Sequence, residues 1–358
     1  MHGYIFKRIE QATFLPAIWD QLTTCYFQYR EFLHHTELFN PCRQRYYTLW
    51  EKDQFVAGAC VYTLSIQLFT FSHIPGKISM QVLGIPASIS AAGIFGKSIA
   101  DQEMLIQFIL EQERGLLLGL NLPPELHCNK VVELTMMPTV VMEQHFDSPE
   151  AYLSSLRAPY RRRARQIQKA FEGVAEIKTG CQAFTTSHYD LYKQIMRHTK
   201  DKLETLSLAF FKNLPENFQL TSYYHEDKLL CWHINCIDHN NLFFFFGGHD
   251  YGQLPHYQSY FNNLFGILKE AINGEYRYID FGQTAEIAKM KTGGTACHKR
   301  MFVYHRNPLI KSLLRICKPL ITYRPPKAIV HPFKGTEPIH QKKNQPHENI
   351  IREATAVS

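Results

Sequence analysis

Several features that would place this chain of 358 residues in a specialised class are missing from it. Its nine cysteines are scattered, odd in number and without a CxxC pair, which argues against a disulfide framework or a redox motif. No apolar run is long enough for a membrane span. The residues after Met1 carry charges where a secretory leader would have an apolar core. We therefore expect a reduced, cytoplasmic protein.

Two ligand-binding motifs also fail on inspection. Residues 91–98 end in Gly-Lys-Ser like a phosphate-binding loop, but that motif requires glycine where Ala91 stands. Cys231, His233 and Cys236 lie along one predicted strand, with His239 in the turn after it. They cannot converge on one zinc ion, because a strand points alternate side chains to opposite faces. No metal site is predicted.

The composition supports well-packed cores. Hydrophobic residues make up 45% of the chain and charged residues 20%, as in ordinary globular proteins. The length is sufficient for two domains. The formal net charge of +7 is compatible with an anionic partner but does not require one.

One stretch, residues 241–294, organises the C-terminal half. It starts with the apolar run Leu242–Phe246, which has the length of a buried strand, and Gly247-Gly248 is predicted to end that strand. An amphipathic helix follows, with Tyr260 to Ile272 in its apolar stripe. A second short strand spans Tyr276–Phe281. This strand–loop–helix–strand unit requires a parallel crossover, and ligands usually bind at the loops that follow such strands.

Polar residues at the two strand ends are the candidates for chemistry. His249 and Asp250 follow the first strand and are candidate general bases; a polar turn is the competing interpretation. Asp280 ends the second strand and is either catalytic or a helix cap. The remaining candidates are tyrosines that could orient substrate or donate a proton, and residues that could bind an anion: Tyr251, Tyr257, Gln283, Lys289 and Lys291. Tyr260, in the helical stripe, is better explained by core packing.

A basic helix joins the two halves. Ser148 and Pro149 give a helix start, and five arginines follow between residues 157 and 165. Of these, Arg161, Arg162 and Arg165 are the candidates for contact with phosphates of a cofactor or RNA. A solvated face or an interdomain brace is the alternative.

The domain organisation follows from the strand and helix patterns. Three strands with short turns, from Phe218 to Phe246, form an antiparallel meander that leads into the central unit. The N-terminal half repeats an order of helix, strands, helix and strand. We predict an α/β fold with mixed, mostly antiparallel sheets flanked by helices. Its predicted parts are an N-terminal domain, a C-terminal domain, a basic amphipathic helix and a disordered tail: residues 1–145, 146–307, 308–324 and 325–358.

These segments together resemble the FemAB-like group of GNAT-fold N-acyltransferases, in which two such domains stand in tandem. Three segments carry the resemblance: Phe146–Ala170 with its arginine-rich helix, FFFFGGHDY at Phe243–Tyr251, and YIDFGQTAEIAKMKTGG at Tyr278–Gly294. The likeness covers residues 138–306 well and the N-terminal half loosely. The motifs are degenerate one by one, whereas their order and spacing are more specific.

The resemblance implies transfer of an acyl or aminoacyl group to an amine. The donor in this group is acyl-CoA or aminoacyl-tRNA, and the acceptor is an amine-bearing small molecule or a lipid-linked envelope precursor. The glycine-rich pyrophosphate loop of ordinary GNAT enzymes is not evident after Phe246, so both donors, and tRNA as a partner, stay open. A non-catalytic binding or scaffold protein of an envelope pathway is the alternative function.

Residues 308–321 form a separate pattern after the last predicted strand. Their aliphatic residues fall broadly on one helical face, and Lys311, Arg315 and Lys318 fall on the other. Such a helix can lie peripherally in a membrane interface. Packing against the N-terminal domain is the more common use of an amphipathic helix.

Overall fold

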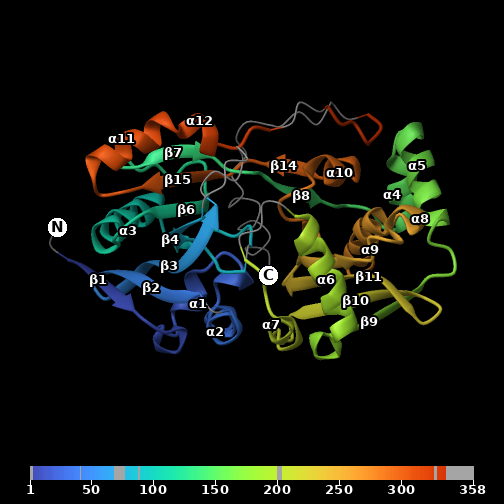
Figure 1. The fold of residues 1–358 in the computed structure, drawn as a ribbon, viewed down its shortest axis with the longest axis horizontal. Coiled ribbons are helices and arrows are strands. Elements are labelled where there is room, and N and C mark those ends of the chain that lie inside the picture. Colours follow the sequence, from blue (N-terminus) through green and yellow to red (C-terminus); the bar gives the residue numbers. More distant parts are fainter. Residues whose placement is uncertain are drawn as a thin grey trace.

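The computed structural model describes residues 3–40, 42–67, 77–87, 89–199, 204–325 and 329–335. Two mixed, mostly antiparallel β-sheets lie side by side with helices packed on them, which confirms the predicted fold class (Figure 1). Among these residues, no helix has both the length and the apolar character needed to cross a membrane.

The first sheet is built mainly from the N-terminal half. Its order is β1-β2-β3-β4-β6-β15-β7, and β5 pairs separately with β3. The helix α3 (Ile99–Gln112) packs on it through Leu105, Ile106 and Ile109, which are buried. The strand bounds are Tyr4–Ile9 (β1), Arg43–Glu51 (β2), Gln54–Gln67 (β3), Lys77–Leu83 (β4), Ile94–Gly96 (β5), Leu117–Leu122 (β6), Val132–Thr135 (β7) and Arg300–Tyr304 (β15).

The second sheet has the order β14-β8-β13-β12-β11-β10-β9. The predicted meander is present as β10 to β12, and the predicted crossover is present as α9 (Ser259–Asn273) between the parallel strands β12 and β13. The strand bounds are Thr139–Glu143 (β8), Ala175–Gly180 (β9), Phe218–His225 (β10), Lys228–Asp238 (β11), Asn241–His249 (β12), Tyr278–Asp280 (β13) and Thr295–Cys297 (β14).

The remaining helices are short. In chain order they are Trp19–Leu22 (α1), Arg30–Phe39 (α2), Pro149–Ser155 (α4), Ala158–Lys169 (α5), Thr186–His198 (α6), Leu208–Lys212 (α7), Leu254–Tyr257 (α8), Glu286–Lys291 (α10), Pro308–Ile316 (α11) and Lys318–Ile321 (α12). Residues 12–28 form two short 3-10 turns and α1, and they bury Trp19, Tyr26 and Phe27.

The two halves exchange strands across the expected boundary at residues 145–146. The strand β8 precedes the boundary but pairs with β13 and β14 in the second sheet. The strand β15 belongs to the second predicted domain but pairs with β6 and β7 in the first sheet. Because of this exchange, the two sheets are interlocked rather than divided at one point in the chain. Local sequence patterns could not predict it, because they do not report long-range pairing.

The halves also share one hydrophobic core. Phe27 and Phe32 from the first half pack against Phe218 and Phe243 of the second, with ring centroids 5.7 Å apart for Phe32–Phe218 and 5.4 Å for Phe27–Phe243. A buried hydrogen bond crosses the same junction, from the Tyr26 amide to the Asp238 carboxylate at 2.9 Å. The junction is thus a packed interior.

Part of the segment expected to be disordered is packed. Val330 is buried, and Phe333 pairs with Leu156 in an isolated β-bridge and contacts the rings of Phe146 and Tyr152. The prediction of disorder is therefore wrong for residues 329–335. It rested on the low apolar content of the whole tail, which did not reveal that Val330 and Phe333 pack against the protein. Residues 336–358 lie outside the described part of the chain.

Candidate functional site

The second sheet opens where its two parallel strands diverge. Pairing between β12 and β13 ends at Phe243 and Asp280, while β12 continues to His249. A bulge at Phe245 bends β12 there, because Ile234 pairs with Phe246 and the next residue of β11 pairs with Phe244. Beyond Phe243, that edge of β12 has no neighbouring strand among the described residues.

The continuation of β12 corrects the prediction of a loop after Phe246. Gly247 and Gly248 lie within the strand rather than ending it. A side chain at Gly248 would collide with the indole of Trp232 on β11, so this glycine permits close packing of an aromatic residue. His249 consequently projects from a strand end and is buried.

A cavity of about 460 Å³ occupies the gap between the diverging strands. One wall comes from β12 and the turn after β13, and the other from the first half through Phe27, Ser90 and Met137. Its lining is mostly apolar with a few polar groups, which is typical of small-molecule sites. Of the candidates from the sequence, five line it: His249, Tyr251, Asp280, Gln283 and Lys289.

Asp280 is held rigidly at the end of β13. Its Oδ1 accepts hydrogen bonds from the Thr139 hydroxyl at 2.7 Å and from the Gly282 amide at 2.6 Å, and its Oδ2 accepts from the Ser90 hydroxyl at 3.3 Å. Ser90 belongs to the first half of the chain, so this buried carboxylate ties both halves together at the cavity wall.

Lys289 is the least ordinary group in the cavity wall. Its side chain is buried, and its Nζ donates to the carbonyl oxygens of Gly282 at 3.2 Å and Gln283 at 2.5 Å. The ammonium also lies 5.8 Å from the centroid of the Phe244 ring. Burial lowers the pKa of Lys289 to about 7, although the nearby Asp280 carboxylate opposes the shift. A lysine with such a pKa is present in both protonation states near neutrality.

His249 and Tyr260 lie together on another part of the wall, with ring centroids 5.7 Å apart. Burial, reinforced by His233, lowers the pKa of His249 to about 4, so its imidazole is neutral at pH 7. The Nδ1 of His249 and the hydroxyl of Tyr260 have no protein hydrogen-bond partner among the described residues. Unpartnered buried polar atoms are costly unless water or a ligand satisfies them. Tyr251, by contrast, stacks on His198 at 3.9 Å between ring centroids.

The turn after β13 is strained where it meets the cavity. Thr284 and Ala285 have positive φ angles of 65° and 48°, which is unfavourable for a β-branched residue in particular. Gln283 fixes the turn, because its Nε2 donates to Asn121 Oδ1 at 2.9 Å and to the Met137 carbonyl at 2.7 Å. Strain held by surrounding contacts is a common feature of functional sites.

Three other candidates lie away from the cavity lining. Asp250 forms an ion pair with Lys228 at 2.8 Å. Tyr257, on the short helix α8, packs against His225 of β10 and against its neighbour His256. Lys291, two residues beyond Lys289, is exposed. The extension of β12 explains why Asp250 lies away from the cavity while His249 lines it, because neighbouring residues at a strand end point in opposite directions.

The arginine-rich helix α5 is also remote from the cavity, at the outer end of the second half (Figure 1). Arg161 donates to the carbonyl oxygens of Ser154 and Leu156 at 3.4 and 2.9 Å, so it caps the end of α4. Arg162 and Arg165 are exposed. Arg161 thus contacts its own half of the chain rather than bracing the two halves, and Arg162 and Arg165 lie on a solvated face.

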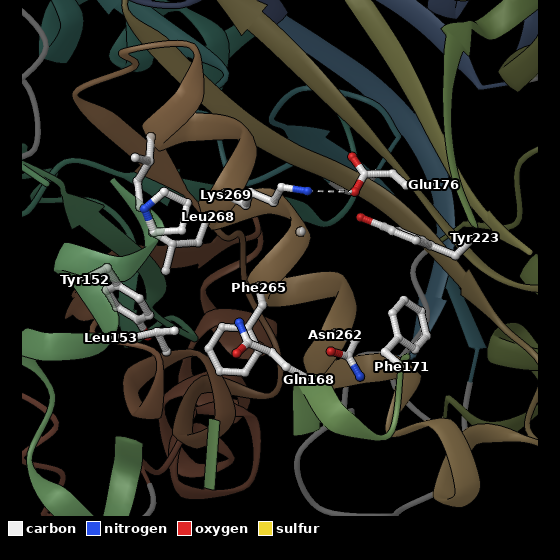
Figure 2. A pocket seen from close by; sticks show the side chains of 13 residues that line it. Tyr152, Leu153, Gln168, Phe171, Glu176, Tyr223, Asn262, Phe265, Leu268 and Lys269 are labelled. Atoms are coloured by element: carbon white, nitrogen blue, oxygen red, sulfur yellow. Dashed lines mark hydrogen bonds and ion pairs between the residues drawn. The ribbon is translucent and has the colours of Figure 1, made fainter. Parts of the chain in front are cut away.

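A second, smaller pocket of about 220 Å³ lies between α4, α5 and α9 (Figure 2). Phe171, Phe265 and Tyr223 line it, and Figure 2 shows the Tyr223 side chain directed toward the ion pair that Lys269 makes with Glu176 at 3.4 Å. None of the residues selected from the sequence lines this pocket, and its facing charges neutralise each other. The larger cavity is therefore the candidate site.

Sequence reasoning missed part of the cavity wall. Tyr260 was assigned to core packing, because its position in the helical stripe carries no sign of a cavity. Ser90 and Thr139, which hold Asp280, lie far from it in sequence. No short-range pattern could have found them. The pairing of β8 with β13 brings Thr139 to Asp280, and the packing of the two halves brings Ser90 there.

No family model and no curated protein matches this chain. Several solved structures are similar to it. FemX is 10% identical, with 78% of this chain and 92% of that chain covered and a TM-score of 0.46. A tandem GNAT protein from the clavulanic acid biosynthesis pathway is 9% identical, with 85% and 99% covered and a TM-score of 0.47. L-PGS from Bacillus licheniformis is 9% identical, with 75% and 87% covered and a TM-score of 0.46.

The likeness of these structures to the chain concerns the fold. At identities of 9–10% and TM-scores below 0.5, none of these likenesses carries a conclusion about donor, acceptor or activity.

Proposed function

We propose that this chain transfers an acyl group from an activated donor to an amine, within the cavity between β12 and the turn after β13. The observation that supports this most strongly is the buried Lys289, whose pKa lies near 7, in the wall of a largely apolar cavity. A general base with a pKa near the working pH suits the abstraction of a proton from an amine nucleophile.

The proposed reaction needs few groups. The acceptor nitrogen attacks the acyl carbon, the new C–N bond forms, and the bond from the acyl carbon to sulfur or oxygen of the donor breaks. Neutral Lys289 takes the proton that the nitrogen loses. In this proposal the Tyr260 hydroxyl, which has no protein partner among the described residues, donates a proton to the leaving sulfur or oxygen. Solvent then returns a proton to Tyr260 and takes the proton from Lys289. Asp280 orients the wall through its hydrogen bonds to Thr139 and Ser90.

The unpaired edge of β12 supports a thioester donor. Beyond Phe243 this edge has no neighbouring strand in the described part of the chain, and residues 244–247 line the cavity. An extended ligand with amide groups can hydrogen-bond to such an edge. The pantetheine arm of an acyl-CoA has this chemistry. Aminoacyl-tRNA would need a cationic surface for its phosphates, and Arg161, Arg162 and Arg165 lie away from the cavity. Acyl-CoA is therefore the proposed donor and an amine-bearing metabolite or envelope precursor the proposed acceptor.

The test is release of free thiol from a series of acyl-CoA donors in the presence of mixed primary amines. The wild type should release thiol only with an amine present, and Lys289→Met should lose most of this activity. Lys291→Met is the matched control, because Lys291 is on the same helix but exposed, and it should leave the rate unchanged.

The pH profile identifies the base. With Lys289 in this role, the rate should rise as pH rises through about 7, the pKa at which the lysine becomes neutral. A rise centred near pH 4 would assign the role to His249 instead. Donor binding without turnover at any pH would reject the enzyme and favour the non-catalytic alternative.

A further inference from the structure

The helices α11 and α12 present an apolar face to solvent rather than to the protein. They lie at the outer boundary of the first half, beside β7 (Figure 1). Five large aliphatic side chains on them are exposed: Leu309 by 79%, Ile310 by 38%, Leu313 by 57%, Ile316 by 75% and Leu320 by 40%. Packing against the N-terminal domain, which the sequence analysis gave as the alternative for this segment, does not explain why these side chains are exposed.

Three of these residues, Leu309, Leu313 and Ile316, form one stripe on α11, because their spacing of four and three positions places them within an arc of about 60° on a helix that turns about 100° per residue. Leu320 extends the exposed apolar surface onto α12. A different face holds the helices on the protein, because Leu314 and Ile321 are buried in the cluster around Val303. The exposed stripe can therefore engage an external surface without disturbing this attachment.

The charge on the face opposite the stripe, and at the ends of the two helices, has one sign. Residues 301–325 contain five cations and no acidic residue: Arg306, Lys311, Arg315, Lys318 and Arg324. The acid-free stretch is longer still, since none occurs between Glu286 and Glu337. Arg306 donates to the main-chain carbonyl of Glu111 on α3, and the Glu111 carboxylate pairs with Lys130 at 3.9 Å.

We propose that α11 and α12 form a docking surface for an anionic lipid bilayer. The aliphatic stripe enters the boundary between headgroups and acyl chains, and the cations of the polar face meet anionic headgroups. A protein partner fits less well, because a stable interface buries about 800 Å² on each side and a single row of side chains is too narrow for that. The proposal is independent of the chemistry in the cavity.

The experiment is sedimentation of the full chain with vesicles of phosphatidylcholine alone and of phosphatidylcholine mixed with phosphatidylglycerol. The wild type should bind the anionic vesicles preferentially and release at high salt, which screens exposed charges. The triple variant Leu309→Ser, Leu313→Ser, Ile316→Ser should bind about tenfold more weakly or worse, because its apolar insertion is lost.

A matched control removes exposed aliphatic side chains elsewhere. Leu38 and Ile177 are exposed by 62% and 48%, and the double variant Leu38→Ser, Ile177→Ser should bind as the wild type does. A charge variant, Lys311→Gln, Arg315→Gln, Lys318→Gln, should lose the preference for anionic lipid. Unfolding by urea checks that each variant keeps the wild-type stability.

Two results would overturn the proposal. One is equal vesicle binding by the wild type and the stripe variant, or no binding by either. The other is self-association of the wild type in ultracentrifugation that the stripe variant abolishes while neither binds vesicles, which would assign the stripe to a second copy of this chain.

Discussion

Replacing Lys289 with methionine should change how the stability of the protein depends on pH. The pKa of a lysine free in solution is 10.5, and burial lowers that of Lys289 to about 7. Between these values the unfolded chain binds a proton that the folded chain does not, so the wild type becomes more stable as pH rises. Below pH 7 both states bind the proton and the dependence vanishes.

The size of this effect follows from the two pKa values. The lowered pKa of Lys289 reduces the free energy of unfolding, and the linkage relation gives the size of this reduction at each pH. The reduction becomes smaller by about 1.6 kcal/mol between pH 7 and 8.5, but by only about 0.4 kcal/mol between pH 6 and 7. Lys289→Met lacks the titrating group. Its free energy of unfolding should therefore fall relative to that of the wild type by these amounts as pH rises.

Urea unfolding of both proteins at pH 6, 7, 8 and 8.5 measures the difference directly. Taking the difference removes the contribution of buried tyrosines and cysteines, which titrate in both proteins alike. Lys291→Met serves as the control and should track the wild type at every pH, since Lys291 is exposed. A wild-type-minus-variant difference that stays constant from pH 6 to 8.5 would refute the assignment of a lowered pKa to Lys289.

Three further predictions concern buried contacts and their contribution to stability. Asp280→Ala should destabilise the protein by about 1–3 kcal/mol, because it leaves the buried Thr139 hydroxyl without its acceptor; urea midpoints measure this, and an unchanged midpoint would show that the contact is not formed. Gly248→Ala should cost about 1–3 kcal/mol through overpacking against Trp232, whereas Gly252→Ala, in a turn, should cost less by the same assay. Phe333→Ala should cost about 2 kcal/mol for a half-buried ring, and thermal unfolding equal to that of the wild type would mean that residues 329–335 do not pack.

The order of elements in the C-terminal half could be predicted because it depends on local pattern. The apolar run before Gly247, the helical stripe of α9 and the short strand ending at Asp280 each have a period that reports their type. The same pattern implied a parallel crossover, and β12 and β13 are parallel. It could not show that β12 continues to His249, because the need for glycine there comes from Trp232 on another strand.

The composition of the cavity depended on tertiary structure that no local pattern contains. Lys289 was selected as an anion-binding residue, yet its distinctive property is the lowered pKa, which arises only from burial beneath the turn at Gly282. The arginines of α5 were selected by charge alone, and one of them caps α4. A run of charged residues indicates an exposed surface but does not show where that surface lies. The distance of these arginines from the cavity could therefore be found only from the fold.

Binding of an acyl donor in the cavity is the most direct test of the central claim, and thermal unfolding with coenzyme A, acyl-CoA and charged tRNA measures it. A donor that binds the folded state at about 100 times its dissociation constant adds about 2.7 kcal/mol of stability. Acyl-CoA should raise the unfolding temperature of the wild type. The shift should disappear in Ile195→Trp, which fills cavity space from the half-buried Ile195, and persist in Ile177→Trp, which changes an exposed site on β9. No shift with any donor, or a shift that Ile195→Trp leaves intact, would contradict the claim that this cavity is the acyl-transfer site.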